Sequence, residues 1–228
     1  MKPKALVIAA HPDDEILGCG GTMARLTQAG HNFTIAILGE GITSRFARRE
    51  DVDPALLKQL HAKAVEAGTI VGVRDVRLFN LPDNRFDTVS LLDVVKIIEG
   101  LIEEIQPHLV FTQHGGDLNI DHVVTYRATL TATRPLSSSP VQSLYAYEVA
   151  SSTEWSFQNF APPFQPNAFF DITGFVEKKI SAMQVYETET RVFPHPRSPE
   201  ALANQAGHWG SVVGVRAAEA FQLIRARL

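Results

Sequence analysis

The feature that most constrains the fold is an alternation, over residues 1–150, of short β-rich apolar runs with segments of helical periodicity. Parallel strands need a crossover between them, usually a helix, so this alternation is typical of a mostly parallel sheet covered by helices. We therefore expect an α/β, Rossmann-like fold with helices on both faces of the sheet. The apolar runs predict strands over Ala5–Ala10, Phe33–Gly39, Val76–Asn80, Leu109–Gln113 and Leu144–Val149.

Amphipathic helices are predicted between and after these strands. From Leu91 to Ile105, apolar residues recur every three or four positions, which places them on one face of a helix, and Pro107 lies just beyond its end. A polar, proline-containing segment over 151–166 predicts a loop. The remaining predicted elements are helices after Asp14, around Leu57–Ala67, and over Val123–Thr133, Gly174–Glu189 and Val215–Leu228, and a strand over Phe169–Ile172.

Composition is that of an ordinary globular protein. The 228 residues are 45% hydrophobic and 20% charged, and we expect them to form a single domain, 1–228. A net charge of −4 gives no broad electrostatic reason to bind nucleic acid or an anionic membrane. The single cysteine, Cys19, excludes an intramolecular disulfide, and no stretch has the roughly 20 apolar residues of a membrane span. We expect a cytoplasmic protein without nucleic-acid partners; homo-oligomerisation is left open.

The first polar motif, His11-Pro12-Asp13-Asp14-Glu15, follows the first predicted strand. Ligands of open α/β sheets collect at the carboxyl ends of strands, so chemistry is expected here. The spacing of His11 and Asp14 lets an imidazole nitrogen and a carboxylate oxygen meet one ion at roughly 2 Å. Asp13 would then lie beside the metal, where it can take a proton from water. The alternative is a loop histidine followed by helix-initiating acids.

The second polar motif, His114–His122, follows the fourth predicted strand. His122 would complete a set of three protein ligands, which leaves a fourth position for water, as in catalytic zinc sites where the pKa of that water falls to about 7. We expect Asp121 to hydrogen-bond an imidazole or a substrate-facing group and so fix its orientation. Its alternative role is that of helix N-cap.

Three further residues are candidates for substrate contacts. Arg45 follows the second predicted strand and lies on the same sheet edge as the first motif, where it could contact hydroxyl or phosphate groups of a ligand. Arg48 and Arg49 are competitors for this role, and a solvated basic surface is the alternative. His114 and Asn119 could line the same cavity, as could Asp117 between them, although a glycine-containing loop also uses polar residues to satisfy its turn. The proline-rich segment Phe193–Arg197 is either a rim loop or a rigid connection.

The paired motifs resemble the LmbE-like, or PIG-L, de-N-acetylase family. The resemblance rests on Ala10–Glu15, on Leu17–Thr22 directly after it and on Gly116–His122, and it spans most of the chain. It implies a zinc-dependent amidohydrolase of LmbE-like fold. Such an enzyme removes the acetyl group from an N-acetylglucosamine-type sugar carried on a larger molecule.

The resemblance also assigns roles to individual residues. It implies that His11, Asp14 and His122 are the zinc ligands and that Asp13 is the general base; another divalent metal such as Fe²⁺ could replace zinc. One position departs from the family pattern, because relatives have a histidine where this chain has Asn119. Asparagine cannot donate a proton as an acid but can hydrogen-bond a developing oxyanion. Protonation of the leaving group would then fall to Asp13, after it has served as base, or to another residue; a single Asp13 that serves as base and then as acid is the more economical hypothesis.

The main hypothesis is hydrolysis of the amide of a sugar conjugate by metal-activated water. Three alternative functions remain. One is hydrolysis or hydration of a non-sugar substrate, and another is non-catalytic glycan binding. The third is a nucleotide-cofactor methyltransferase, because Leu17–Gly21 resembles its glycine motif and Glu40 follows about 20 residues later. A cofactor-binding glycine turn should begin where the strand ends, whereas seven residues separate Ala10 from Gly18. Those glycines are better explained by close packing of the first helix on the sheet.

Overall fold

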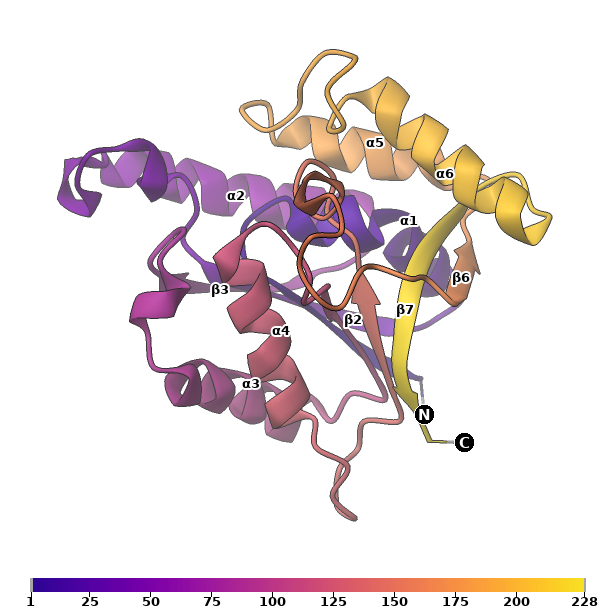
Figure 1. The fold of residues 1–228 in the computed structure, drawn as a ribbon, viewed down its shortest axis with the longest axis horizontal. Coiled ribbons are helices and arrows are strands. Elements are labelled where there is room, and N and C mark those ends of the chain that lie inside the picture. Colours follow the sequence, from indigo (N-terminus) through magenta and orange to yellow (C-terminus); the bar gives the residue numbers. More distant parts are fainter. Residues whose placement is uncertain (1, 228) are drawn as a thin grey trace.

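The computed structural model describes residues 2–227, which form a seven-stranded, mostly parallel sheet with helices on both faces (Figure 1). The strands are β1 (Lys4–Ala9), β2 (Asn32–Gly39), β3 (Asp75–Leu81), β4 (Leu109–Gln113), β5 (Ser143–Tyr147), β6 (Ala168–Asp171) and β7 (Ala218–Ala226). Their order in the sheet is β3-β2-β1-β4-β5-β7-β6. Strands β1 to β5 are parallel, whereas β7 is antiparallel to both β5 and β6.

Two layers of helices bury the two faces of the sheet. The helices are α1 (Asp14–Gln28), α2 (Pro54–Ile70), α3 (Leu91–Ile105), α4 (Ile120–Ala132), α5 (Val176–Val185) and α6 (Pro199–Val213). Helices α1, α2 and α5 cover one face, and α3 and α4 cover the other (Figure 1). Strand β1 shows why both layers are needed: Ala5, Val7 and Ala9 pack on the first face, and Leu6 and Ile8 pack on the second. A parallel strand buried on both sides is therefore continuously apolar.

The glycines after the first motif allow α1 to pack closely. A Cβ atom on Gly18 would lie 2.1 Å from the ring of Tyr147, and one on Gly21 would lie 2.7 Å from the side chain of Ile172. Both distances are far below van der Waals contact, so neither position has room for a side chain. This agrees with the packing role expected for these glycines and not with a cofactor-binding turn.

All six predicted strands are present, with bounds that differ by at most two residues. The predicted helix over Val215–Leu228 is wrong: Ala218–Ala226 forms strand β7, and Leu228 lies outside the described residues. This segment is rich in residues that favour helices, but it pairs with β5 on one side and β6 on the other. Tertiary pairing therefore outweighs intrinsic helix propensity. Within residues 2–227 we find no helix long and apolar enough to span a membrane.

Candidate active site

The two polar motifs meet at the carboxyl edge of the sheet, around a cavity of about 560 Å³. The first motif lies in the turn between β1 and α1, and the second lies between β4 and the first turn of α4. Loops after β2, β3 and β5 and the segment between α5 and α6 complete the walls. The lining residues that concern the chemistry are His11, Asp13, Asp14, Arg45, Asp83, Asn119, His122, Trp155, Glu189 and Arg197.

Three of these side chains form a cluster that fits a metal ion. One ligand atom from each of His11, Asp14 and His122 lies within 4.8 Å of the others. Asp14 Oδ2 is 3.4 Å from His11 Nδ1 and 3.3 Å from His122 Nε2. Asp14 and His122 are buried, whereas the His11 side chain is 13% exposed to the cavity. Two imidazole nitrogens and one carboxylate oxygen, open on one side, form a donor set of the kind found in catalytic zinc sites.

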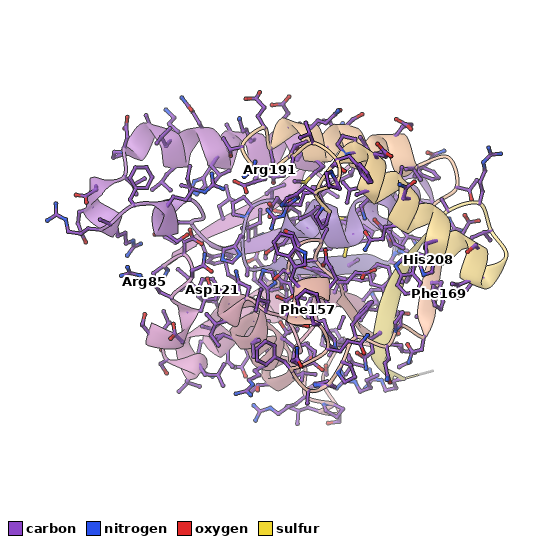
Figure 2. The ribbon with its side chains drawn as sticks, turned by 45° about the horizontal axis from the view of Figure 1, so that its top comes forward. Arg85, Asp121, Phe157, Phe169, Arg191 and His208 are labelled. Carbon is purple, nitrogen blue, oxygen red and sulfur yellow. The ribbon has the colours of Figure 1, made fainter. Side chains whose placement is uncertain are left out.

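The His11 ring contacts Asp121, the second residue of α4, on the side away from Asp14. Asp121 is labelled in Figure 2. His11 Nε2 lies 2.8 Å from Asp121 Oδ2, so Nδ1 is left to face Asp14. The same carboxylate accepts hydrogen bonds from the backbone N–H groups of Asn84, at 2.6 Å, and Phe86, at 2.9 Å. Asp121 therefore fixes both the ring and the loop after β3, as a carboxylate behind a ligand histidine does.

The His122 ring has the same arrangement with a different carboxylate. Its Nδ1 lies 3.1 Å from Asp117 Oδ1, and Asp117 Oδ2 accepts a hydrogen bond from Thr153 Oγ1 at 2.6 Å. Burial alone would lower the pKa of His122, but the carboxylates of Asp14 and Asp117 outweigh it and raise the pKa to about 9. The negative charges of Asp14 and Asp117 thus favour a positive charge next to them, and such surroundings suit a bound cation.

Asp13 lies beside the cluster in an unusual backbone conformation. It precedes α1 with φ at 113°, a value that side-chain-bearing residues rarely adopt, and its carboxylate makes no capping hydrogen bond. The Asp13 N–H donates to Glu15 Oε2 at 3.0 Å, and Asp13 Oδ2 accepts a hydrogen bond from Arg197 Nη1 at 2.6 Å. Burial raises the pKa of Asp13 well above its ordinary value, while Arg197 opposes the shift and Asp14 adds to it.

Two of the three predicted substrate contacts line the cavity. Arg45, whose side chain is 43% exposed, lies on its rim and forms an ion pair with Glu189. Asn119 is the N-cap of α4, because its Oδ1 accepts from the Asp121 N–H at 2.9 Å, and its Nδ2 donates to Asn84 Oδ1 at 3.0 Å. The capping role that was the alternative for Asp121 therefore belongs to Asn119, whose amide is engaged at both ends.

The third predicted substrate contact, His114, lies outside the cavity lining. Its side chain is completely buried, its Nδ1 accepts from the Gly116 N–H at 3.1 Å, and its ring meets the edge of Phe164 at 5.3 Å between centroids. In this structure the turn after β4 uses His114 to satisfy its own backbone, as expected of polar residues in a glycine-containing loop.

Sequence reasoning missed three charged residues of the cavity. Asp83 Oδ1 lies 3.3 Å from His11 Nε2, and Glu189 and Arg197 come from the segment between α5 and α6. The prolines of Phe193–Arg197 do signal a rim loop. Nothing in the sequence, however, indicates which cavity residue Arg197 contacts.

A buried cluster of two histidines and a carboxylate, with a further carboxylate beside it at the edge of an α/β sheet, is typical of a metal-dependent hydrolase. The chain belongs to the GlcNAc-PI de-N-acetylase (PIG-L) family, whose model matches residues 6–133. All three candidate ligands lie within the matched residues.

Comparisons over the whole chain agree with this assignment. The chain is 26% identical over 213 residues to a probable N-acetyl-alpha-D-glucosaminyl L-malate deacetylase 2 of Bacillus anthracis, covering 90% of each protein. The N,N'-diacetylchitobiose deacetylase of Pyrococcus horikoshii superposes with a TM-score of 0.74 at 21% identity, covering 97% of this chain and 83% of that one. The 4-carboxy-2-hydroxymuconate hydratase of Pseudomonas putida KT2440 superposes with a TM-score of 0.76 at 21% identity, covering 100% and 98%. These solved structures share the LmbE-like α/β fold.

Proposed function

We propose that this protein is a metal-dependent de-N-acetylase that releases acetate from an N-acetylglucosamine-type sugar conjugate. The observation that carries the proposal is the His11, Asp14 and His122 cluster with the Asp13 carboxylate beside it in an open cavity. Membership of the de-N-acetylase family and the deacetylase name of the Bacillus anthracis relative support this reaction.

His11, Asp14 and His122 would hold the metal, which we propose to be zinc. The same nitrogen and oxygen donors suit another divalent ion such as Fe²⁺. When bound, such an ion lowers the pKa of water and polarises an amide carbonyl. Asp121 and Asp117 keep the two imidazoles turned toward it.

Asp13 is the residue placed to move protons. It accepts a proton from the attacking water and delivers that proton to the nitrogen of the leaving amino sugar, so that one carboxyl group serves as base and then as acid. Burial raises the pKa of Asp13, which favours the protonated carboxyl group needed in the second half of this cycle. Asn119 cannot supply the proton and is already engaged as a helix cap.

The cavity has the size and lining of a small-molecule site. Its volume of about 560 Å³ falls within the range of roughly 300–1,000 Å³ common for such sites. Trp155, which is 42% exposed, lines the cavity with an aromatic ring that could pack against a sugar, and Arg45 lies at the rim, where it could contact hydroxyl or anionic groups of the conjugate. We infer that the amino sugar binds over the cluster with its aglycone toward Arg45.

A panel of substrates tests the proposal. Zinc-loaded protein is incubated with N-acetylglucosaminyl malate, an N-acetylglucosaminyl inositol and N,N'-diacetylchitobiose, and acetate and free amine are quantified together. Equal amounts of both products, lost in His122→Ala, are expected. No acetate from any conjugate, with the metal bound and the protein folded, would contradict the proposal. Such a result would favour a non-sugar substrate, since the same fold also carries a hydratase.

A further inference from the structure

Arg197 reaches the cavity from the far end of the chain and contacts four groups there. Its Nη1 donates to Asp13 Oδ2 at 2.6 Å and lies 3.3 Å from Glu189 Oε2. Its Nε donates to Ser151 Oγ at 2.8 Å and to the Ala150 carbonyl at 3.3 Å. The side chain is only 19% exposed, so the guanidinium is part of the cavity wall.

We propose that Arg197 is a positioning residue that holds the Asp13 carboxylate in the orientation needed for proton transfer. The inference rests on the role proposed above for Asp13. Arginine is permanently charged and has no proton to give at neutral pH, so Arg197 acts through Asp13 and not as an acid.

The Asp13 carboxylate depends on this contact. Among the residues that the structure describes, Arg197 is the only one that hydrogen-bonds to the carboxylate of Asp13. The bond to Glu15 fixes the Asp13 backbone, not its carboxyl group. With Oδ2 held by the guanidinium, Oδ1 remains for exchange of a proton with the reacting groups. Without Arg197, rotation of the carboxyl group would be restrained by sterics alone.

Arg197 is itself fixed on several sides, as a positioning group must be. Glu189 pairs with Arg197 and also with Arg45, which links the two arginines of the cavity. The next residue, Ser198, is the N-cap of α6: its Oγ accepts from the Ala201 N–H at 3.1 Å. The planar fork of arginine can contact Ser151, Glu189 and Asp13 together, whereas the single ammonium group of lysine cannot reproduce this geometry.

A purely stabilising ion pair explains these contacts less well. Removing two charges from water costs about as much free energy as their attraction returns, so buried pairs add little net stability. Arg197 contacts instead the Asp13 carboxylate, which lies next to the three candidate metal ligands. The orientation of a carboxylate that transfers a proton affects the rate of the reaction.

Kinetics of matched variants test the proposal. In Arg197→Ala and Arg197→Lys we expect kcat to fall about 10- to 100-fold, the range seen when groups that orient a reactive residue are removed. KM and metal content should stay within about twofold of wild type, since no substrate or metal contact is lost. Guanidinium added to Arg197→Ala should restore part of the rate. Arg191→Ala is the control, because Arg191 is exposed and lies outside the cavity lining (Figure 2).

A double variant separates positioning of Asp13 from a general structural role. Asp13→Asn/Arg197→Ala should be no slower than Asp13→Asn, because a residue that acts only through Asp13 has no effect once that carboxylate is gone. An equal further loss in the Asp13→Asn background, or an unchanged kcat in both Arg197 variants, would overturn the proposal. Arg197→Lys keeps the test available if the alanine variant does not fold.

Two readouts keep this inference independent of the proposed substrate. If no sugar conjugate releases acetate, the same variants are assayed with 4-nitrophenyl acetate, an activated ester that needs no sugar recognition. Crystal structures of metal-loaded wild type and Arg197→Ala provide the second readout. We expect the Asp13 carboxylate to take more than one orientation in the variant; a single, unchanged orientation would overturn the inference even if deacetylation is confirmed.

Discussion

The two parts of the chain build the cavity in different ways. Residues 2–147, which include the five parallel strands, supply all three candidate ligands and the carboxylates behind them, from the loops that follow β1 and β4 and from the first turns of α1 and α4. Residues 148–227 add the antiparallel strands and supply Arg197, Glu189 and Tyr186 from the segment after α5. The first part therefore supplies the candidate metal site, and the second part supplies residues around the proposed base.

This division has a consequence for related proteins. The family model matches residues 6–133 and so covers the ligands but not the segment between α5 and α6. A change in the second part can alter how the base and the substrate are held and leave the metal ligands untouched. The variants of His122, Asp121, Asp117 and Tyr186 below test whether the two parts can be separated in this way.

The largest expected effect concerns the first part alone. His122→Ala removes one of three ligands, so bound metal should be lost and deacetylation should fall about a thousandfold or more, because the metal contributes several kcal/mol to the barrier. Acetate release and elemental analysis measure the two quantities. His208→Ala, at an exposed histidine of α6 (Figure 2), should change neither. Full metal content in His122→Ala would show that the ligands are assigned wrongly.

A smaller effect is expected behind the ligands. Asp121→Asn and Asp117→Asn keep the three ligands but remove the negative charge behind each ring, and each should weaken metal binding about 10- to 100-fold. Competition with a chelator of known affinity measures this. The exposed Asp87→Asn is the charge-matched control. Unchanged affinity in both variants would mean that these carboxylates do not orient the imidazoles.

Tyr186→Phe tests the contribution of the second part to stability. The Tyr186 hydroxyl donates to the buried Glu15 Oε1 at 2.6 Å. Its loss leaves a buried carboxylate oxygen without this donor, so we expect the free energy of unfolding to fall by about 1 to 3 kcal/mol, with metal affinity unchanged. Denaturant titration gives the first value. Tyr126→Phe is the control, because the Tyr126 hydroxyl makes no hydrogen bond within the described residues. A drop in metal affinity would break the separation of the two parts.

The smallest expected effect depends on pH. Burial raises the pKa of Glu148, which accepts a hydrogen bond from Trp209 Nε1 at 2.6 Å, to about 7. Between its ordinary pKa and about 7 the folded protein holds more protons than the unfolded chain, so this residue makes the fold less stable as pH rises through that window. Relative to wild type, Glu148→Gln should therefore gain stability from pH 5 to pH 8.

The gain should be about 1 to 2 kcal/mol, less than the full shift implies because the side chain is partly exposed. Unfolding in denaturant at both pH values measures it, and Glu177→Gln, at an exposed glutamate of α5, is the control. A stability difference from wild type that does not change with pH would show that Glu148 does not titrate in this window.

The parallel part of the sheet and the candidate ligands were predictable because their signals are local. Continuous apolar runs predict buried strands, and His11 and Asp14 lie in one turn. The sequence of strand β7 predicts a helix because its residues favour helices, and only pairing with its neighbours β5 and β6 makes it a strand. The contact of Arg197 with Asp13 joins positions 184 residues apart, so no spacing rule could reveal it. The hydrogen bonds of Asn119 likewise depend on a separate loop.

The backbone of Asp13 also has a consequence for the evolution of this protein. A φ of 113° costs an aspartate of order 1 to 3 kcal/mol, and glycine adopts the same conformation almost freely. Asp13→Gly would thus relax the chain at the one position where the proposed base must stand. Selection for thermal stability alone would favour glycine at position 13, whereas selection for turnover would favour aspartate.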